Sequence, residues 1–289
     1  MIFPTTFLHL ILLVESFLLF LCVRRLRDTG DFLLREQKLQ LKASSTQKTS
    51  TDFAIPMIYV VTPTYTRPTQ LPDLTRLANT LRLVPRIHWI VAEDRNTTTK
   101  PVADLLAASK LRFTHLAAER PHELIGKVIG RGVFNRRAAL DWIRTYAEPS
   151  GVIYFADDDN SYDVRIFEEI RQTRVVAVFP VGLVLKFGIS SPIVRQGTVI
   201  GFFDAFLGGR KFAMDMAGFS VSVKHLNSKP LATFPAAVSW LEEGFMRSLE
   251  VEKDDLEPKA ESCTRVWVWH TRTEKAAEPK LQHLQGFHC

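Results

Sequence analysis

Short apolar runs alternate with helix-like segments between residues 55 and 160, and this alternation constrains the fold more than any other feature of the chain. The runs rich in β-branched and aromatic residues lie at 57–62, 87–92, 112–116 and 152–155. The helix-like segments lie between them, at 71–83, 101–109 and 135–145. Strands that alternate with helices favour a mostly parallel sheet. The sequence therefore predicts an α/β fold whose first half is a doubly wound, Rossmann-like nucleotide-binding unit.

The remaining residues, 161–289, show a less regular pattern of elements. Further strands are expected at 175–179, 199–204, 219–223 and 265–269, with a helix at 239–249. We expect these strands to form a mixed sheet. A chain of 289 residues is long enough for one large domain or two small ones with a substantial core.

Three carboxylates, Asp157, Asp158 and Asp159, come directly after the fourth predicted strand. Open α/β sheets bind their ligands at the carboxyl ends of the strands. Adjacent like charges need a cation, and clustered hard oxygens suit Mg²⁺ or Mn²⁺. The alternative is a solvated acidic turn before a helix at 164–170, with Asp163 as the N-cap of that helix.

The N-terminal segment 2–23 is almost continuously apolar and is about as long as a helix must be to span a bilayer. We expect 1–23 to be a transmembrane signal-anchor; a cleaved signal peptide and a buried core helix are the alternatives. Glu15 lies inside this segment, where a carboxylate is costly unless it is paired or protonated. Arginines follow the segment at positions 24, 25 and 27, so the positive-inside rule predicts a cytosolic location for the rest of the chain.

Residues 24–54 are polar and lack the apolar content that a packed core requires, so they are predicted to be a stem or linker. The folded domain is expected at 55–289. The net charge of +6 is moderate. Because no basic stripe with interleaved aromatic residues is found, we expect no nucleic-acid partner.

Three cysteines, Cys22, Cys263 and Cys289, are too few for a disulfide framework. Cys22 lies in the apolar segment, and a bond from Cys263 to Cys289 or to a second chain stays open. Asn96-Thr97-Thr98 is the one glycosylation sequon, so Asn96 is a candidate glycan site in a lumenal protein.

Six short motifs occur in an order that is typical of one enzyme family. They are VVTPTY at 60–65, WIVAED at 89–94, YFADDDN at 154–160, DMAGF at 215–219, DLEP at 255–258 and WHTRTEK at 269–275. Together they resemble the β-1,3-glucuronosyltransferases of glycosyltransferase family 43, over roughly residues 55–275. The resemblance implies a type-A glycosyltransferase (GT-A) fold, with a UDP-sugar-binding half at 55–160 and an acceptor-binding half at 161–289.

The resemblance also implies an activity. It is an inverting, Mn²⁺-dependent transfer of glucuronic acid from UDP-glucuronate to the 3-hydroxyl of a terminal β-galactose, on a proteoglycan linker or another glycoconjugate. It implies a homodimer and a single-pass type II protein of the Golgi membrane with a lumenal catalytic domain, against the positive-inside rule. The alternatives are a related transferase that uses another donor such as UDP-xylose, and a glycan-binding paralogue with little turnover.

The same resemblance assigns donor-side roles. Asp159 would hold the metal, Asp158 would contact the ribose, and Asp157 would support them. The remaining donor-binding residues implied by the resemblance are Pro63, Thr64, Tyr65, Asp94, Arg131, Arg136, His270 and Arg272.

The sequence departs from the family pattern in the element RGVFNRRAAL at 131–140. Asn135 replaces a glutamine and Arg137 replaces an asparagine, and the preceding loop, 117–130, is shorter than usual. We expect weaker nucleotide binding from these changes.

Counting back from the DLEP motif places the general base of the family on Glu243. A slip of one residue would move this role to Glu242.

On the acceptor side, Arg210 and Asp215 match the family. Phe206 stands where a tryptophan is expected, and Ser190 or Ser191 stands where a glutamate is expected.

Overall fold

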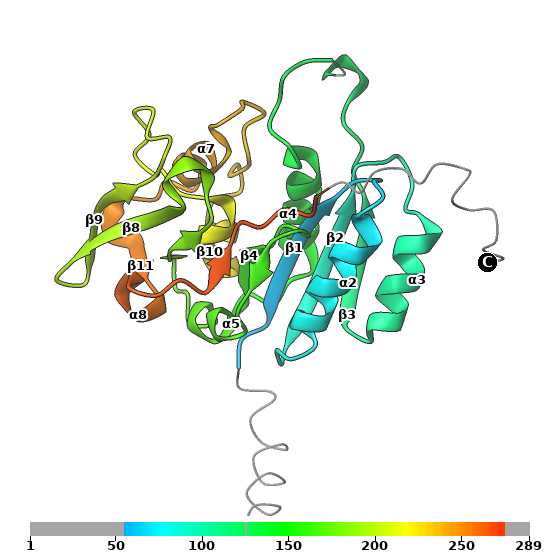
Figure 1. Ribbon diagram of the computed structural model, residues 1–289, viewed down its shortest axis with the longest axis horizontal. Helices are drawn as coiled ribbons and strands as arrows, with labels where there is room; N and C mark the ends of the chain where they lie inside the picture. The colour runs from blue at the N-terminus through cyan, green and yellow to red at the C-terminus, as the bar shows by residue number, and fades with distance from the viewer. Residues whose placement is uncertain (1–54, 125, 275–289) are drawn as a thin grey trace, which may run out of the picture. The chain divides into compact units, whose positions relative to one another are not determined.

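The computed structural model describes residues 55–124 and 126–274 (Figure 1). A seven-stranded sheet with the order β11-β6-β10-β4-β1-β2-β3 forms the body of this part of the chain. Four of its strands pair in parallel, as predicted: β1 (Ile58–Thr64), β2 (Ile87–Glu93), β3 (Arg112–Ala117) and β4 (Val152–Phe155).

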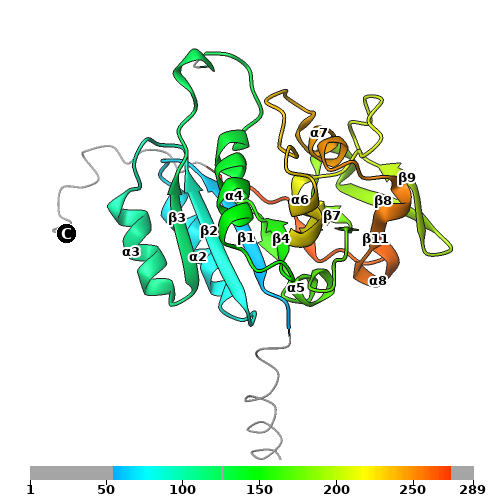
Figure 2. The ribbon, with the colours of Figure 1, turned by 180° about the vertical axis from the view of Figure 1, so that it is seen from behind.

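Helices cover both faces of these parallel strands. Helices α2 (Gln70–Leu81) and α3 (Lys100–Ser109) lie on one face, and α4 (Val133–Tyr146) lies on the other (Figures 1 and 2). Alternate residues of β1 divide between the two layers, since Ile58 and Val60 pack on the α2 side whereas Tyr59 and Val61 pack on the α4 side. This period of two on a buried strand confirms the doubly wound α/β prediction for this region.

The later part of the chain extends the same sheet. Strand β10 (Phe219–Ser222) runs antiparallel between β4 and β6 (Val176–Val178), and β11 (Leu256–Pro258) joins β6 in parallel. The mixed character predicted beyond residue 160 is therefore present, within a sheet that both halves share.

A second, five-stranded sheet has the order β5-β12-β7-β8-β9. Its strands are β5 (Ser161–Tyr162), β12 (Val268–Trp269), β7 (Val181–Gly182), β8 (Ile189–Arg195) and β9 (Thr198–Phe203). The sequence did not predict β8, and the strand predicted at 265–269 shortens to β12.

Short helices fill the connections. They are α5 (Arg165–Ile170), α6 (Val223–Ser228), α7 (Leu241–Ser248) and α8 (Ala260–Cys263), with 3₁₀ turns η1 (His122–Leu124), η2 (Leu185–Phe187), η3 (Met216–Gly218) and η4 (Lys253–Asp255).

Several predictions fall on residues that the structure does not describe. Among the described helices none has the length and apolar character needed to cross a bilayer, and the span expected at 1–23 and the stem expected at 24–54 lie outside the description. Cys22 and Cys289 also lie outside it. Cys263 is described as a free thiol whose pKa burial raises to about 12. Asn96 is exposed between β2 and α3.

Candidate functional site

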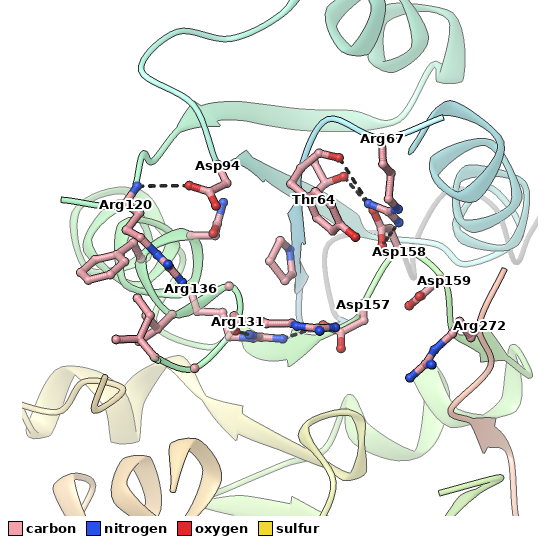
Figure 3. Close-up of a pocket in the computed structure, with 18 of the residues that line it drawn as sticks. Thr64, Arg67, Asp94, Arg120, Arg131, Arg136, Asp157, Asp158, Asp159 and Arg272 are labelled. Carbon is pink, nitrogen blue, oxygen red and sulfur yellow. Dashed lines mark hydrogen bonds and ion pairs between the residues drawn. The ribbon is translucent and has the colours of Figure 1, made fainter. Parts of the chain in front are cut away.

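A cavity of about 490 Å³ opens at the carboxyl ends of β1, β2 and β4 (Figure 3). This is the edge where open α/β sheets bind ligands. All the donor-side residues expected from the sequence line it, although they are spread over five regions of the chain. They are Pro63, Thr64, Tyr65, Asp94, Arg131, Arg136, Asp157, Asp158, Asp159, His270 and Arg272.

Two of the three adjacent acids are already paired with arginines. Arg136 donates to Asp157 at 2.6 Å, and Arg67 donates to Asp158 at 2.7 Å (Figure 3). The hydroxyl of Thr64 also donates to Asp158, at 2.7 Å. Among the described residues no cation pairs with Asp159, and burial, together with Asp158 and Asp157, raises its pKa. Asp159 is therefore the carboxylate of the cluster that most needs an external cation.

This donor set restricts the kind of metal site that is possible. The described residues contain no group of three or more histidine, cysteine, aspartate or glutamate side chains arranged to hold a metal ion. Mg²⁺ and similar hard cations often take one or two carboxylates and complete their shell with water and substrate phosphates. The residues therefore fit a metal held by Asp159 and the oxygens of a bound diphosphate, and they do not fit a cage made of protein ligands alone.

Arg67 is a site residue that the sequence analysis missed. Its guanidinium lies 4.6 Å from the centroid of the Tyr65 ring, which supports that exposed ring from one side. Burial lowers the pKa of Arg67, but the hydrogen bonds that Arg67 donates to Asp158 and Asp73 raise this pKa overall. Its position could have indicated this role, because Arg67 follows the end of the first strand and the adjacent acids, such as Asp158, need a positive charge nearby.

Gly132 makes the approach of helix α4 to the cavity possible. It has a φ of +65°, and a Cβ there would lie 2.9 Å from the Cβ of Pro63 and 2.8 Å from Nη1 of Arg136. Arg136 is buried and is held in place by the carbonyl of Arg131, at 2.9 Å, as well as by Asp157. Glycine is therefore needed where α4 begins.

The two departures from the family pattern have local partners. Asn135 is buried and lines the cavity, and its amide donates to the carbonyl of Ala92 at 2.8 Å. Arg137 donates from Nε to the carbonyl of Phe234 at 2.8 Å and does not line the cavity. The substitution at Arg137 therefore points to packing rather than to direct ligand contact, and the expected loss of nucleotide affinity stays a prediction.

The segment 270–274, called here the C-terminal arm, follows β12 across the acids. His270 and Arg272 line the cavity, whereas the hydroxyl of Thr271 donates to the carbonyl of Asp159 at 2.5 Å. His270 lies 3.0 Å from the carboxylate of Asp215, and this hydrogen bond raises the pKa of His270. The arm thus places a cationic edge beside the acid cluster.

The structure shows different surroundings for the two adjacent glutamates, and the position of the base stays a prediction. Glu243 is fully buried; one carboxylate oxygen accepts from the backbone N–H of Phe212 at 2.7 Å and the other accepts from Arg247. Because both oxygens are engaged inside the core, Glu243 is not placed to receive a proton from a ligand. Glu242, the alternative one residue earlier, is therefore the other candidate for this role.

Glu242 lies among the acceptor-side residues. Its carboxylate is 4.0 Å from Nη1 of Arg210, and its side chain keeps 16% of its surface exposed. Burial raises its pKa to about 7, with Asp215 adding to the shift and Arg136 and Arg210 opposing it. A carboxylate with a pKa near neutrality is suited to general-base chemistry.

The other acceptor-side residues gather around Arg210. Its guanidinium lies 4.9 Å from the centroid of the half-exposed Phe206 ring and pairs with Asp204 at 3.2 Å. Ser190 is buried on β8, and its hydroxyl has no hydrogen-bond partner among the described residues. Arg210 and Asp215 therefore lie near Glu242, and Phe206 lies beside Arg210.

Comparison with known proteins shows which family the chain resembles. Residues 77–274 match the model of glycosyltransferase family 43. The chain is 46% identical over 252 residues to human galactosylgalactosylxylosylprotein 3-beta-glucuronosyltransferase 3, covering 80% of this chain and 75% of the relative.

Two relatives from Drosophila melanogaster are longer than this chain. It is 44% identical over 221 residues to galactosylgalactosylxylosylprotein 3-beta-glucuronosyltransferase S, covering 76% of this chain and 54% of the relative. It is also 44% identical over 225 residues to the P enzyme, covering 77% of this chain and 47% of the relative. The chain thus spans about half the length of these two relatives.

Proposed function

The chain belongs to glycosyltransferase family 43, and from this membership we propose that it transfers glucuronic acid from UDP-glucuronate to the 3-hydroxyl of a terminal β-galactose. The acceptor would be a proteoglycan linker or another glycoconjugate, and the mixed α/β fold would be of the GT-A type. One observation carries the proposal: one cavity collects the carboxylate of Asp159, which pairs with no cation among the described residues, and the basic side chains of Arg131, Arg272 and His270. An anionic nucleotide sugar with its metal matches both halves of that charge pattern.

The donor would lie along the strand ends. In this proposal the uracil packs on the ring of Tyr65 beside Asp94, and the ribose reaches Asp158. The diphosphate lies between the arm and the start of α4, where His270 and Arg272 face it. Mn²⁺ held at Asp159 would offset the negative charge that develops on the leaving diphosphate. Protonated His270, favoured by Asp215, would stabilise the same charge.

The acceptor would bind on the side of Phe206 and Arg210. The ionised carboxylate of Glu242 takes the proton of the 3-hydroxyl while that oxygen forms its bond to the anomeric carbon. The bond from the anomeric carbon to the diphosphate oxygen breaks, and UDP leaves from the opposite face. The configuration at the anomeric carbon is therefore inverted. Phe206 offers a ring for stacking on galactose that is smaller than the tryptophan expected there.

Donor competition tests the proposal against its two alternatives. Full-length protein would be incubated with Mn²⁺, galactose-terminated acceptors and an equal mixture of UDP-glucuronate and UDP-xylose, and the products would be read by mass. Glucuronylated product is expected. Xylosylated product would point to the other transferase, and UDP binding without any product would point to a glycan-binding paralogue. The curated relatives are named as glucuronosyltransferases, which favours the first outcome.

We also propose that the protein is a type II protein of the Golgi membrane, with 55–289 in the lumen, and that it forms a homodimer. The apolar segment 2–23 and the polar segment 24–54 support the anchor and stem. Protease added to sealed microsomes should spare the domain, and digestion without detergent would show that the arginines after the apolar segment decide the topology. In the lumen Asn96 would be accessible to glycosylation, which a glycosidase mass shift would detect.

A further inference from the structure

Asp73, in the first turn of α2, is a fully buried carboxylate that does not line the cavity. One of its oxygens accepts from Arg76 at 2.7 Å and from the hydroxyl of Thr273 at 2.6 Å. The other oxygen accepts from Arg67 at 2.9 Å. A buried carboxylate is costly unless each oxygen is satisfied, so this geometry is closely specified.

The partners of Asp73 lead to the candidate donor site by two routes. Arg67 uses the same terminal nitrogen to bind Asp73 and Asp158, so Asp73 fixes the guanidinium that holds Asp158. Thr273 belongs to the C-terminal arm, whose residues His270 and Arg272 line the cavity. Asp73 therefore contacts both the strand-end side and the arm side of the site without touching the space where a ligand would lie.

The arm is fastened at alternate positions. Thr271 binds the carbonyl of Asp159 and Thr273 binds Asp73, whereas His270 and Arg272, between and beside them, line the cavity. The two threonines therefore tie the arm to the protein, while His270 and Arg272 line the cavity. Thr271 is anchored to Asp159, one of the three adjacent acids, and Thr273 is anchored to Asp73 on helix α2.

We propose that Asp73 is a positioning residue for the donor site: through Thr273 it holds the C-terminal arm over the cavity, and through Arg67 it orients Asp158. The inference rests on the proposed nucleotide-sugar site. A purely structural role exists as a competing explanation, because an acidic residue in the first turn of a helix is favoured by the helix dipole. A variant of Thr273 distinguishes the two roles, since the hydroxyl of Thr273 holds the arm to Asp73 and has no part in the interaction of Asp73 with the dipole of α2.

The test uses variants of the full-length protein, with two readouts. Asp73→Asn keeps one acceptor oxygen but turns the other into a donor that faces a cation. Thr273→Val removes the arm hydroxyl with little change in volume, and Thr273→Ser restores it. Asp104→Asn is the matched control, because Asp104 loses only an exposed ion pair with Lys100 on α3. UDP affinity with Mn²⁺ would be measured by calorimetry, and backbone mobility of the arm would be measured by hydrogen–deuterium exchange without ligand.

Thr273→Val should weaken UDP binding by about tenfold, the effect of one hydrogen bond to a charged group, and should speed exchange in 270–274 with an unchanged melting temperature. Asp73→Asn should weaken binding at least as much, while Thr273→Ser and Asp104→Asn should stay within about twofold of the parent. The proposal is overturned if Thr273→Val matches the parent in both readouts, whatever Asp73→Asn does. Failure of the parent to bind UDP would instead count against the proposed function, and the exchange comparison would still decide the role of Asp73 on the arm.

Discussion

Replacing Glu242 with glutamine should abolish most turnover while leaving the donor site intact. The carboxylate lies 4.0 Å from Arg210 and its pKa is raised to about 7, and in the proposed reaction it takes the acceptor proton. Glutamine keeps the size and removes the basicity. Because general-base catalysis typically contributes about 10²–10⁴-fold, turnover should fall by that factor while UDP affinity changes little.

Glu243→Gln is the matched control, one position along the same helix. Its buried carboxylate accepts from the backbone N–H of Phe212 and from Arg247. Glutamine retains one acceptor oxygen but cannot satisfy both donors. The free energy of unfolding should fall by about 1–3 kcal/mol, while turnover per folded molecule stays close to that of the parent.

The pH dependence of turnover and of stability provides a second, independent test of the role of Glu242. Glu242 acts as a base only when ionised, so turnover of the parent should rise as pH increases through about 7, and this limb should vanish in Glu242→Gln. The folded-state pKa is above the unfolded value, so the stability contributed by this group is present at low pH and is lost as pH rises through about 7. Glu242→Gln should therefore be more stable than the parent at pH 8.

Steady-state kinetics with chemical denaturation of each variant would check these expectations. The reasoning is refuted if folded Glu243→Gln is inactive while Glu242→Gln turns over at the parent rate. It is also refuted if both variants turn over normally, because the base would then lie elsewhere.

Three further predictions concern other parts of the site. Asp159→Asn should remove most of the Mn²⁺ dependence of UDP binding, and calorimetry that shows the same linkage in variant and parent would exclude a metal at Asp159. Gly132→Ala should lower the free energy of unfolding by about 1–3 kcal/mol and weaken UDP binding, since its Cβ would press on Pro63; denaturant titration showing parent stability would contradict this. Phe206→Ala should raise the acceptor KM by about 5–10-fold and leave the donor KM unchanged, and an equal rise in both would argue against ring stacking on the acceptor.

Most of the central sheet could be predicted because its signals are local. Strands β1, β2 and β4 are short apolar runs followed by polar residues, and the acids after Phe155 mark the ligand-binding edge without any knowledge of the tertiary structure. Strand β8 was missed because Ser190-Ser191-Pro192 interrupts the apolar alternation that identifies a strand. Its pairing with β9 depends on contacts that a local pattern does not contain.

The features of the candidate site that the sequence did not predict depend on distant contacts. Arg67 meets Asp158 across 91 positions of sequence, and Glu243 meets the backbone of Phe212 across 31 positions. Nothing within helix α7 shows that the second of two adjacent glutamates turns into the core. Only the tertiary structure separates Glu242 from Glu243.

The most direct test of the proposed activity is the identity of the product. Full-length protein, UDP-glucuronate, Mn²⁺ and a terminal β-galactoside would be incubated, and the product would be analysed by mass and by NMR of its new glycosidic linkage. We expect one added glucuronic acid, attached to the 3-oxygen with the anomeric configuration inverted from that of the donor. A different linkage, a retained configuration, or UDP binding without any glucuronylated product would contradict it.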